Sequence, residues 1–383
     1  MLILEDLLEK ARIETGLDDF GGDEFLEPLT ILIKSLNEEA NLNDIGRFRA
    51  EMNISNGLAY RLKVEDYIKQ HPDVLEQKIE KPVFIVGLPR TGTTALHHML
   101  NQDPANHTLR IWEANKPVPP PEEATYLTDP RIEESRASLE MTEQFLPGFG
   151  VTHLLGAEEP DECYMLFNRT FMSVEYSAIF HVPSYAKWIY AHDHGANYAY
   201  HKKQLQLLQH KKKGRWILKA PFHQLGLRAI LKHYPDAILV QTHRAPMAIV
   251  ASGCSFSELL RKGGSDDIDR NVIGHDWMEM LRVYSTEFER ARSELEPLHP
   301  GQFLDIQFKD LLQQPYAAVE QVYAAAGTAL SEQGRAAMEQ WQANNPKDKQ
   351  GKHEYRLEDY GLSRADVEAL FGDYVKRYNL NME

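Results

Sequence analysis

The chain has few of the features that mark secreted, membrane-spanning or nucleic-acid-binding proteins. It has only two cysteines, Cys163 and Cys254, in 383 residues, which is too few for a disulfide framework or a cysteine-based zinc site. No apolar run approaches the length of a membrane span, and the opening segment MLILEDLLEKA turns acidic too early for a signal peptide. These absences predict a cytoplasmic protein without a membrane span.

Positive charge is also scarce. The chain has 42 Lys and Arg against 57 Asp and Glu, a formal net charge of −15. Nucleic acids and anionic membranes need surfaces with clustered Lys and Arg, so neither is expected as a main partner. A hydrophobic fraction of 43% supplies a full core. Any anion-binding site in this acidic chain must therefore be locally basic.

One such site is indicated by residues 81–100, KPVFIVGLPRTGTTALHHML. The apolar run 83–86 is typical of a strand covered on both faces in a parallel sheet, and Gly87 and Gly92 permit a tight turn after it. Apolar residues then recur at helical spacing from Ala95 onward. A strand, a turn and a helix in this order direct free backbone N–H groups toward an anionic ligand.

This loop lacks the lysine that nucleoside-triphosphate loops need. Those loops read G-x-x-x-x-G-K-[ST], whereas residues 87–94, GLPRTGTT, carry Thr93 in the lysine position. The only cation is Arg90, whose planar guanidinium suits bidentate contact with a multi-oxygen anion. We therefore expect an anion site that uses no metal ion.

A second strand and turn occur at residues 237–256, AILVQTHRAPMAIVASGCSF. The apolar run 238–240 predicts another strand. His243, Arg244, Ala245 and Pro246 follow it, and then comes a helix that carries Ser252.

These two motifs together resemble those of the sulfotransferases that use 3′-phosphoadenosine 5′-phosphosulfate (PAPS). In that family the first loop binds the 5′-phosphosulfate, and an arginine in an R-x-P turn binds the 3′-phosphate with a serine eight residues later. Arg244 and Ser252 match this spacing, while Ala245 departs from the acidic residue or asparagine that the family often has. The resemblance implies that the PAPS-binding residues of the two turns are Pro89, Arg90, Thr91, Gly92, Thr93, Thr94, Arg244 and Ser252.

Three further segments support the resemblance. Residues 215–223, RWILKAPFH, resemble the family's strand whose lysine and nearby histidine face the transferred group, which implies this role for Lys219 and His223. In the better-known cytosolic members of the family the histidine stands two places after the lysine, where this chain has Pro221. Residues 303–312 resemble a late strand and helix start. The basic, glycine-containing stretch 344–360 resembles a loop that closes over the cofactor and would place Lys352 there, although a solvated linker explains it equally well.

The resemblance implies an α/β fold with a central parallel sheet flanked by helices. Residues 1–78 are expected to form an N-terminal helical region and residues 79–383 the sulfotransferase domain. Within that domain we expect a helical acceptor-binding insertion at 112–214 and a C-terminal loop and helix at 340–383. The aromatic residues of the insertion favour an acceptor with an apolar or ring-bearing body, or they are ordinary helix core.

Sulfuryl transfer needs a general base for the acceptor hydroxyl and cations that stabilise charge, roles that the resemblance gives to Arg90 and Lys219. Two residues compete as the base. Glu113, at the end of the expected strand HTLRIWE, resembles the base of the tyrosylprotein branch, and His223 follows the Lys219 strand. Their alternatives are a helix-cap or ion-pair role and a satisfied loop histidine. We favour Glu113 and retain His223.

The predicted function is a sulfotransferase that moves the sulfuryl group of PAPS in line to a hydroxyl of a small-molecule, lipid or carbohydrate acceptor. The product nucleotide would be adenosine 3′,5′-bisphosphate. A nucleotide-dependent kinase is the alternative enzyme, and the missing loop lysine disfavours it. A nucleotide-binding protein without catalysis would keep Arg90, Arg244 and Ser252 while neither base candidate mattered. No motif indicates the identity of the acceptor, the oligomeric state or the role of residues 1–78.

Overall fold

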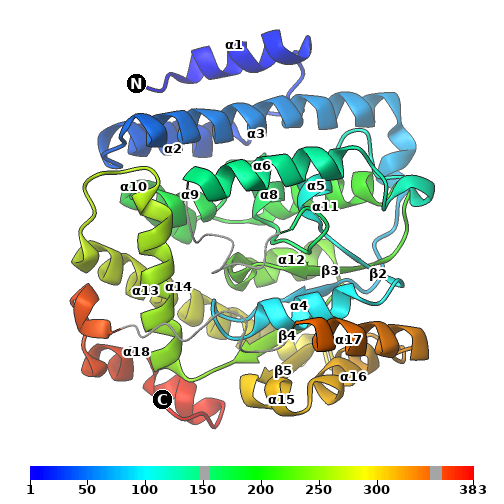
Figure 1. Ribbon diagram of the computed structural model, residues 1–383, viewed down its shortest axis with the longest axis vertical. Coiled ribbons are helices and arrows are strands. Elements are labelled where there is room, and N and C mark those ends of the chain that lie inside the picture. Colours follow the sequence, from blue (N-terminus) through cyan, green and yellow to red (C-terminus); the bar gives the residue numbers. More distant parts are fainter. Residues whose placement is uncertain (146–155, 346–355) are drawn as a thin grey trace. The chain divides into compact units, whose positions relative to one another are not determined.

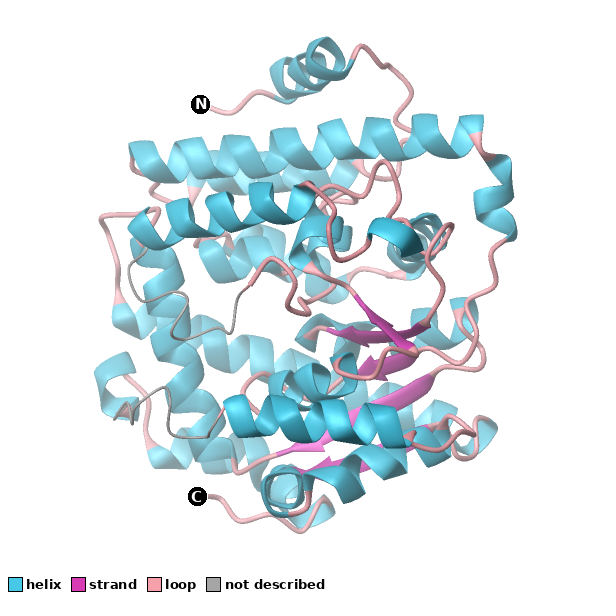
Figure 2. Cartoon of the chain, turned by 45° about the vertical axis from the view of Figure 1, so that its right-hand side comes forward, coloured by secondary structure: helices cyan, strands magenta, loops and turns pink. Residues whose placement is uncertain are grey.

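Five parallel strands form one sheet in the computed structural model, which describes residues 1–145, 156–345 and 356–383. The order across the sheet is β2-β3-β1-β4-β5, and the strands are drawn in magenta in Figure 2. Their bounds are β1 Val83–Ile85, β2 Asn106–Thr108, β3 Arg215–Lys219, β4 Ile238–His243 and β5 Phe303–Gln307. The predicted α/β fold with a parallel sheet is confirmed.

The register places three segments that carry candidate site residues at neighbouring strand ends. Ile85 of the central strand β1 pairs with Lys219 of β3 on one side and with Val240 of β4 on the other. The loop after β1, the end of β3 and the turn after β4 therefore leave the same edge of the sheet. Strands β2 and β3 lie on one side of β1, and the next two strands, β4 and β5, lie on the other side. The order in which the chain adds strands to the sheet therefore switches sides at this edge. Open α/β sheets bind ligands at such a point.

Both faces of the central strand are covered, as its apolar run predicts. On one face Val83 and Ile85 belong to a buried cluster with side chains of α4 (Thr93–Asn101) and α16 (Pro315–Ala325). On the other face the ring of Phe84 lies 5.2 Å from that of Tyr234, measured between centroids. Burial on both sides holds β1, and with it the start of the loop that follows, in one position.

The chain divides into two units, and the sheet lies in the second, which comprises Glu80–Thr108, Gly214–Glu258 and Asp269–Glu383. Figure 1 labels most of the helices. Besides α4 and α16, this unit has η3 Pro221–Gly226, α12 Leu227–His233, α14 Arg270–Leu295, η4 Glu296–Leu298, α15 Phe308–Gln313, α17 Glu332–Asn344, η5 Leu357–Tyr360 and α18 Arg364–Arg377. Helix α13, Pro246–Lys262, begins in the second unit and ends in the first.

The first unit, Met1–Ile79, Leu109–Lys213 and Leu259–Ile268, has no strand within its described residues. Its helices are α1 Leu4–Thr15, α2 Leu26–Glu38, α3 Asp44–Gln70, η1 Pro72–Glu76, α5 Ile111–Asn115, η2 Glu123–Thr125, α6 Arg131–Phe145, α8 Tyr164–Phe167, α9 Glu175–Ile179, α10 Pro183–Ala191 and α11 Gly195–Leu208. The helical character expected of the N-terminal region and of the insertion is confirmed. None of the helices in the described ranges of the chain is long and apolar enough to cross a membrane.

One sequence-based expectation is wrong. The segment HTLRIWE was expected to be a strand that ends at Glu113, but β2 ends at Thr108 and residues 111–115 form α5. The Glu113 carboxylate accepts a hydrogen bond of 3.1 Å from the backbone N–H of Arg110. The backbone N–H of Ala114 in turn donates to the carbonyl of Arg110. These two bonds favour a helical turn over an extended chain.

Candidate functional site

The loop between β1 and α4 has the backbone of an anion-binding turn. Arg90 and Gly92 have φ angles of 67° and 92°, in the region that residues with a side chain rarely adopt. A Cβ added to Gly92 would stand 2.6 Å from the Phe308 ring, so only glycine fits there. Helix α4 begins at Thr93, and no side chain of the described residues caps it. Its first-turn N–H groups remain available to a ligand.

The loop is fastened to the neighbouring strand β4. The hydroxyl of Thr91, which is fully buried, donates to the Leu88 carbonyl at 2.6 Å and lies 2.6 Å from the hydroxyl of Thr242. A Cβ on Gly87 would come within 2.1 Å of that Thr242 hydroxyl, which explains the glycine. The Thr91 side chain thus holds the loop, while Pro89, Arg90 and Thr94 are partly exposed.

The structure brings Arg90, Arg244 and Ser252 into direct contact. Nε of Arg90 donates to Oγ of Ser252 at 2.9 Å, and Nη1 of Arg244 donates to the carbonyl oxygen of Arg90 at 2.9 Å. The Arg244 guanidinium also lies 4.4 Å from the centroid of the Phe308 ring. Two motifs that are far apart in the sequence therefore form one cationic site at the carboxyl ends of β1 and β4.

The charge of this site is not balanced at Arg244. Burial, and then the positive charge of Arg90, lower the pKa of Arg244 below its ordinary value. In the part of the chain that the structure describes, Arg244 forms no ion pair with a carboxylate. Two half-buried cations side by side repel one another unless an anion joins them. The arrangement therefore fits a ligand with negative charge.

Lys219 and His223 lie beside the start of the same loop. Lys219 is buried at the end of β3, in register with Ile85. His223 is buried in η3, with its ring edge-on to Phe84 at a centroid distance of 5.0 Å. The amide of Gln224 donates to the Val86 carbonyl at 2.7 Å, which holds η3 against the residue that precedes the loop.

His97, on helix α4, belongs to the same neighbourhood as Lys219. Its Nε2 lies 3.2 Å from the carbonyl of Ile217. Burial, and then the positive charge of Lys219, place the pKa of His97 well below its ordinary value. A neutral histidine beside Lys219 adds no charge to the site and leaves the lysine as its cation on the β3 side.

Glu113 belongs to the first unit, unlike the other candidates that the structure describes. It is fully buried, caps α5 through the Arg110 N–H, and accepts a hydrogen bond of 2.9 Å from the Tyr126 hydroxyl. Burial, followed by the charge of Glu113, raises the pKa of Tyr126 well above its ordinary value. The helix-cap alternative for Glu113 is thus present in the structure. Lys352 lies outside the described residues.

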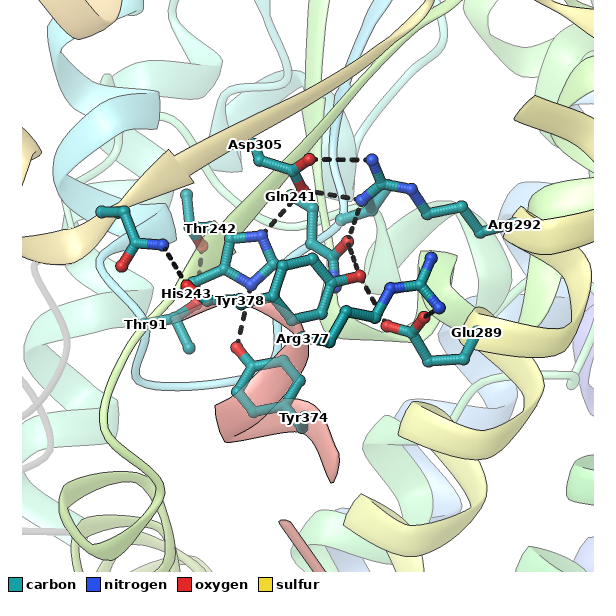
Figure 3. A network of polar contacts seen from close by, with 12 residues as sticks. Thr91, Gln241, Thr242, His243, Glu289, Arg292, Asp305, Tyr374, Arg377 and Tyr378 are labelled. Carbon is teal, nitrogen blue, oxygen red and sulfur yellow. Dashed lines mark hydrogen bonds and ion pairs between the residues drawn. The ribbon is translucent and has the colours of Figure 1, made fainter. Parts of the chain in front are cut away.

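Sequence reasoning missed Phe308 and the network around His243 that Figure 3 shows. Phe308 follows β5 directly, in a segment noted only for its strand and helix pattern. His243 stands immediately before Arg244, so its position beside the predicted ligand-binding turn was the one available signal. Its partners Asp305 and Tyr374 are distant in the sequence and could not be inferred.

Comparisons with known proteins agree with this geometry. The sequence profile described as Sulfotransferase family matches residues 82–332. The crystal structure of sulfotransferase STF1 from Mycobacterium tuberculosis H37Rv is 34% identical, with coverage of 97% of this chain and 99% of that chain, and has a TM-score of 0.86. That of sulfotransferase STF9 from Mycobacterium avium is 29% identical, with coverage of 100% and 98%, and has a TM-score of 0.91.

No functionally curated protein matches the sequence significantly. The family profile nevertheless spans well over half of the chain, and the similarity to STF1 extends over nearly all of it. The loop after β1, the Arg244 turn and the parallel sheet are the parts that the resemblance predicted. On this evidence the chain belongs to the sulfotransferase family and is a sulfotransferase enzyme.

Proposed function

We propose that this sulfotransferase takes the sulfuryl group from PAPS and transfers it to a hydroxyl group of a small-molecule, lipid or carbohydrate acceptor. The observation that carries the proposal is the contact of Arg244 with the Arg90 carbonyl and of Arg90 with Ser252. It puts two cations, a hydroxyl and the N-terminus of α4 at one edge of the sheet. A nucleotide with an anionic group at each end of its ribose matches such a set of donors.

The donor residues divide into two groups in this proposal. Arg90 and the backbone of residues 89–94 hold the sulfonated 5′ end, where the positive φ angles expose N–H groups. Arg244 and Ser252 hold the 3′-phosphate, for which the guanidinium fork is suited. Lys352 is assigned to closure over the nucleotide by its position in a late basic stretch of the sequence.

The chemistry assigned to the chain is charge stabilisation and proton removal. Lys219 and Arg90 stabilise negative charge at the transferred group, and their fixed positions spare the cost of reorganising solvent during the reaction. Glu113 or His223 removes the proton of the acceptor hydroxyl. Each candidate has one observation in its favour. Glu113 is a carboxylate that already accepts a hydrogen bond from the Tyr126 hydroxyl, and His223 lies in the same unit as Lys219.

The test is transfer of radiolabelled sulfate from PAPS across a panel of phenols, lipid alcohols and sugars. We expect a labelled product with at least one acceptor class, formed in equal amount with adenosine 3′,5′-bisphosphate and formed more slowly by Arg244→Ala at low PAPS concentration. The same panel with γ-labelled ATP should give no product. Phosphorylation of an acceptor would favour the kinase alternative, and tight nucleotide binding without any transfer would favour the non-catalytic binder.

A further inference from the structure

The C-terminal helix α18 is hydrogen-bonded to His243, the residue that precedes Arg244 (Figure 3). The hydroxyl of Tyr374 lies 3.0 Å from Nδ1 of His243 and also forms a hydrogen bond with the backbone of Arg244. Tyr378, which follows α18, stacks on the His243 ring with centroids 3.9 Å apart and planes 26° apart. Two tyrosines of one segment thus hold the last residue of β4 and the first residue of the turn.

The other side of His243 is anchored to the edge of the sheet. Its Nε2 lies 2.8 Å from Oδ1 of Asp305 on β5, and both carboxylate oxygens of Asp305 accept hydrogen bonds from Arg292, at 2.6 and 2.8 Å. Burial would raise the pKa of Asp305, but the hydrogen bonds from Arg292 and then His243 outweigh it and hold that pKa well below its ordinary value. Asp305 is therefore ionised and can only accept.

The ionised Asp305 fixes one proton position in the network. Because Asp305 only accepts, the His243 ring donates to it from Nε2. Burial raises the pKa of Tyr374, so its hydroxyl stays protonated and forms the hydrogen bond with Nδ1. The Tyr374 oxygen then accepts from the Arg244 backbone. A continuous chain of hydrogen bonds runs from Arg244 to Asp305 and Arg292, and His243 is fully buried within it.

The side chain of Arg244 has few contacts with the residues that the structure describes. It contacts the Arg90 carbonyl and the Phe308 ring, and an arginine with a free backbone loses much conformational entropy when a ligand orders it. Fixing the backbone in advance lowers that cost and so raises affinity. The network around His243 holds the backbone at Arg244 in this way. Its carboxylate, that of Asp305, bonds to His243 and Arg292 and leaves the Arg244 guanidinium for a ligand.

We propose that His243 and Tyr374 are positioning residues that hold Arg244 ready for the 3′-phosphate of the nucleotide. The inference rests on the proposed function, which assigns Arg244 to that phosphate. The contacts of α18 reach the turn after β4, whereas the loop after β1 takes the 5′ end. Loss of the network should therefore weaken nucleotides with a 3′-phosphate and spare those without one.

Calorimetric titration of adenosine 3′,5′-bisphosphate and adenosine 5′-monophosphate tests this selectivity. Tyr374→Phe keeps the ring and removes only the hydroxyl. Since a single hydrogen bond is lost, we expect affinity for the bisphosphate to fall about three- to tenfold, with affinity for the monophosphate unchanged. Tyr323→Phe is the matched control, because its buried hydroxyl bonds to Asp103 and Asn106 instead. It should leave both affinities as in the wild type.

A second variant, Asp305→Asn, keeps the proposal testable if Tyr374→Phe does not fold. It should also reduce the preference for the bisphosphate over the monophosphate. Unchanged preference in both variants, or an equal loss of both nucleotides, overturns the positioning role. The proposed function is tested separately by the wild type and Arg244→Ala. A wild type without preference for the bisphosphate, or an Arg244→Ala variant that keeps it, rejects the 3′-phosphate assignment and this inference together.

Discussion

Arg244 donates a hydrogen bond of 2.9 Å to the backbone carbonyl of Arg90, so the turn after β4 is fastened to the loop after β1. Arg90 in turn donates a hydrogen bond to the hydroxyl of Ser252, which lies on α13, the helix that follows Arg244. The two ends of the proposed nucleotide site are therefore one structure, not two independent loops.

Removal of either arginine should weaken nucleotide binding. Arg90→Ala and Arg244→Ala each delete a charge-assisted contact, which costs over about 1.4 kcal/mol and lowers affinity for adenosine 3′,5′-bisphosphate more than tenfold. Calorimetric titration measures the effect. Arg282→Ala is the control, since Arg282 pairs with Glu279 on the surface of α14. Unchanged titrations in both test variants would reject the assignment.

Gly92→Ala should damage the loop in two ways. A side chain at a φ of 92° is strained, at a cost of about 1–2 kcal/mol, and the new Cβ would stand 2.6 Å from Phe308. We expect a lower melting temperature together with weaker nucleotide binding. Gly301→Ala has similar strain at a φ of 79° but no atom within 4 Å of the added Cβ. It should lower the melting temperature and leave binding intact, and equal binding in the two variants would contradict the role of Gly92.

Removal of the general base should lower turnover without weakening nucleotide binding. Glu113→Gln keeps the size of the side chain and His223→Asn keeps a polar one, and loss of a general base lowers turnover by about 10²–10⁴-fold. The variant that removes the base should keep its affinity for adenosine 3′,5′-bisphosphate, which titration checks alongside the transfer assay. Glu113→Gln also retains an oxygen that can accept from Tyr126. Full turnover in both variants would place the base elsewhere.

The stability of the first unit should depend on pH through Glu175. Burial raises its pKa to about 7, the hydrogen bond from Asn168 opposes the rise, Asp161 and Glu162 add to it, and Arg49 lowers it. The folded state therefore binds more protons than the unfolded state between the ordinary pKa of 4.5 and about 7. This contribution stabilises the fold at low pH and is lost as the pH rises through 7.

Thermal melts between pH 5.5 and 8 measure this effect. Glu175→Gln should raise the melting temperature at pH 8, by about 2–4 °C for each kcal/mol of destabilisation that it removes. It should also flatten the dependence of the melting temperature on pH. Glu27→Gln, at an exposed position of α2, is the matched control and should leave the profile unchanged. A wild-type melting temperature that rises from pH 6 to 8, with no change in Glu175→Gln, would show that Glu175 is ionised in the fold.

The sequence predicted the features that depend on neighbouring residues. The apolar runs of β1, β3 and β4 and the glycines of the first loop act locally, and so the parallel sheet could be foreseen together with the turns that carry Arg90 and Arg244. The contacts of His243 with Asp305 and Tyr374 join distant parts of the chain, and no local pattern specifies them. The helix at Glu113 escaped prediction because one side-chain hydrogen bond to Arg110 decides between a strand and a helical turn.

The most direct test of the central claim is a comparison of two nucleotides by calorimetric titration of the wild-type protein. The account predicts that adenosine 3′,5′-bisphosphate binds tightly in the presence of a metal chelator and that ATP with magnesium binds much more weakly. Tighter binding of magnesium ATP than of the bisphosphate would contradict it.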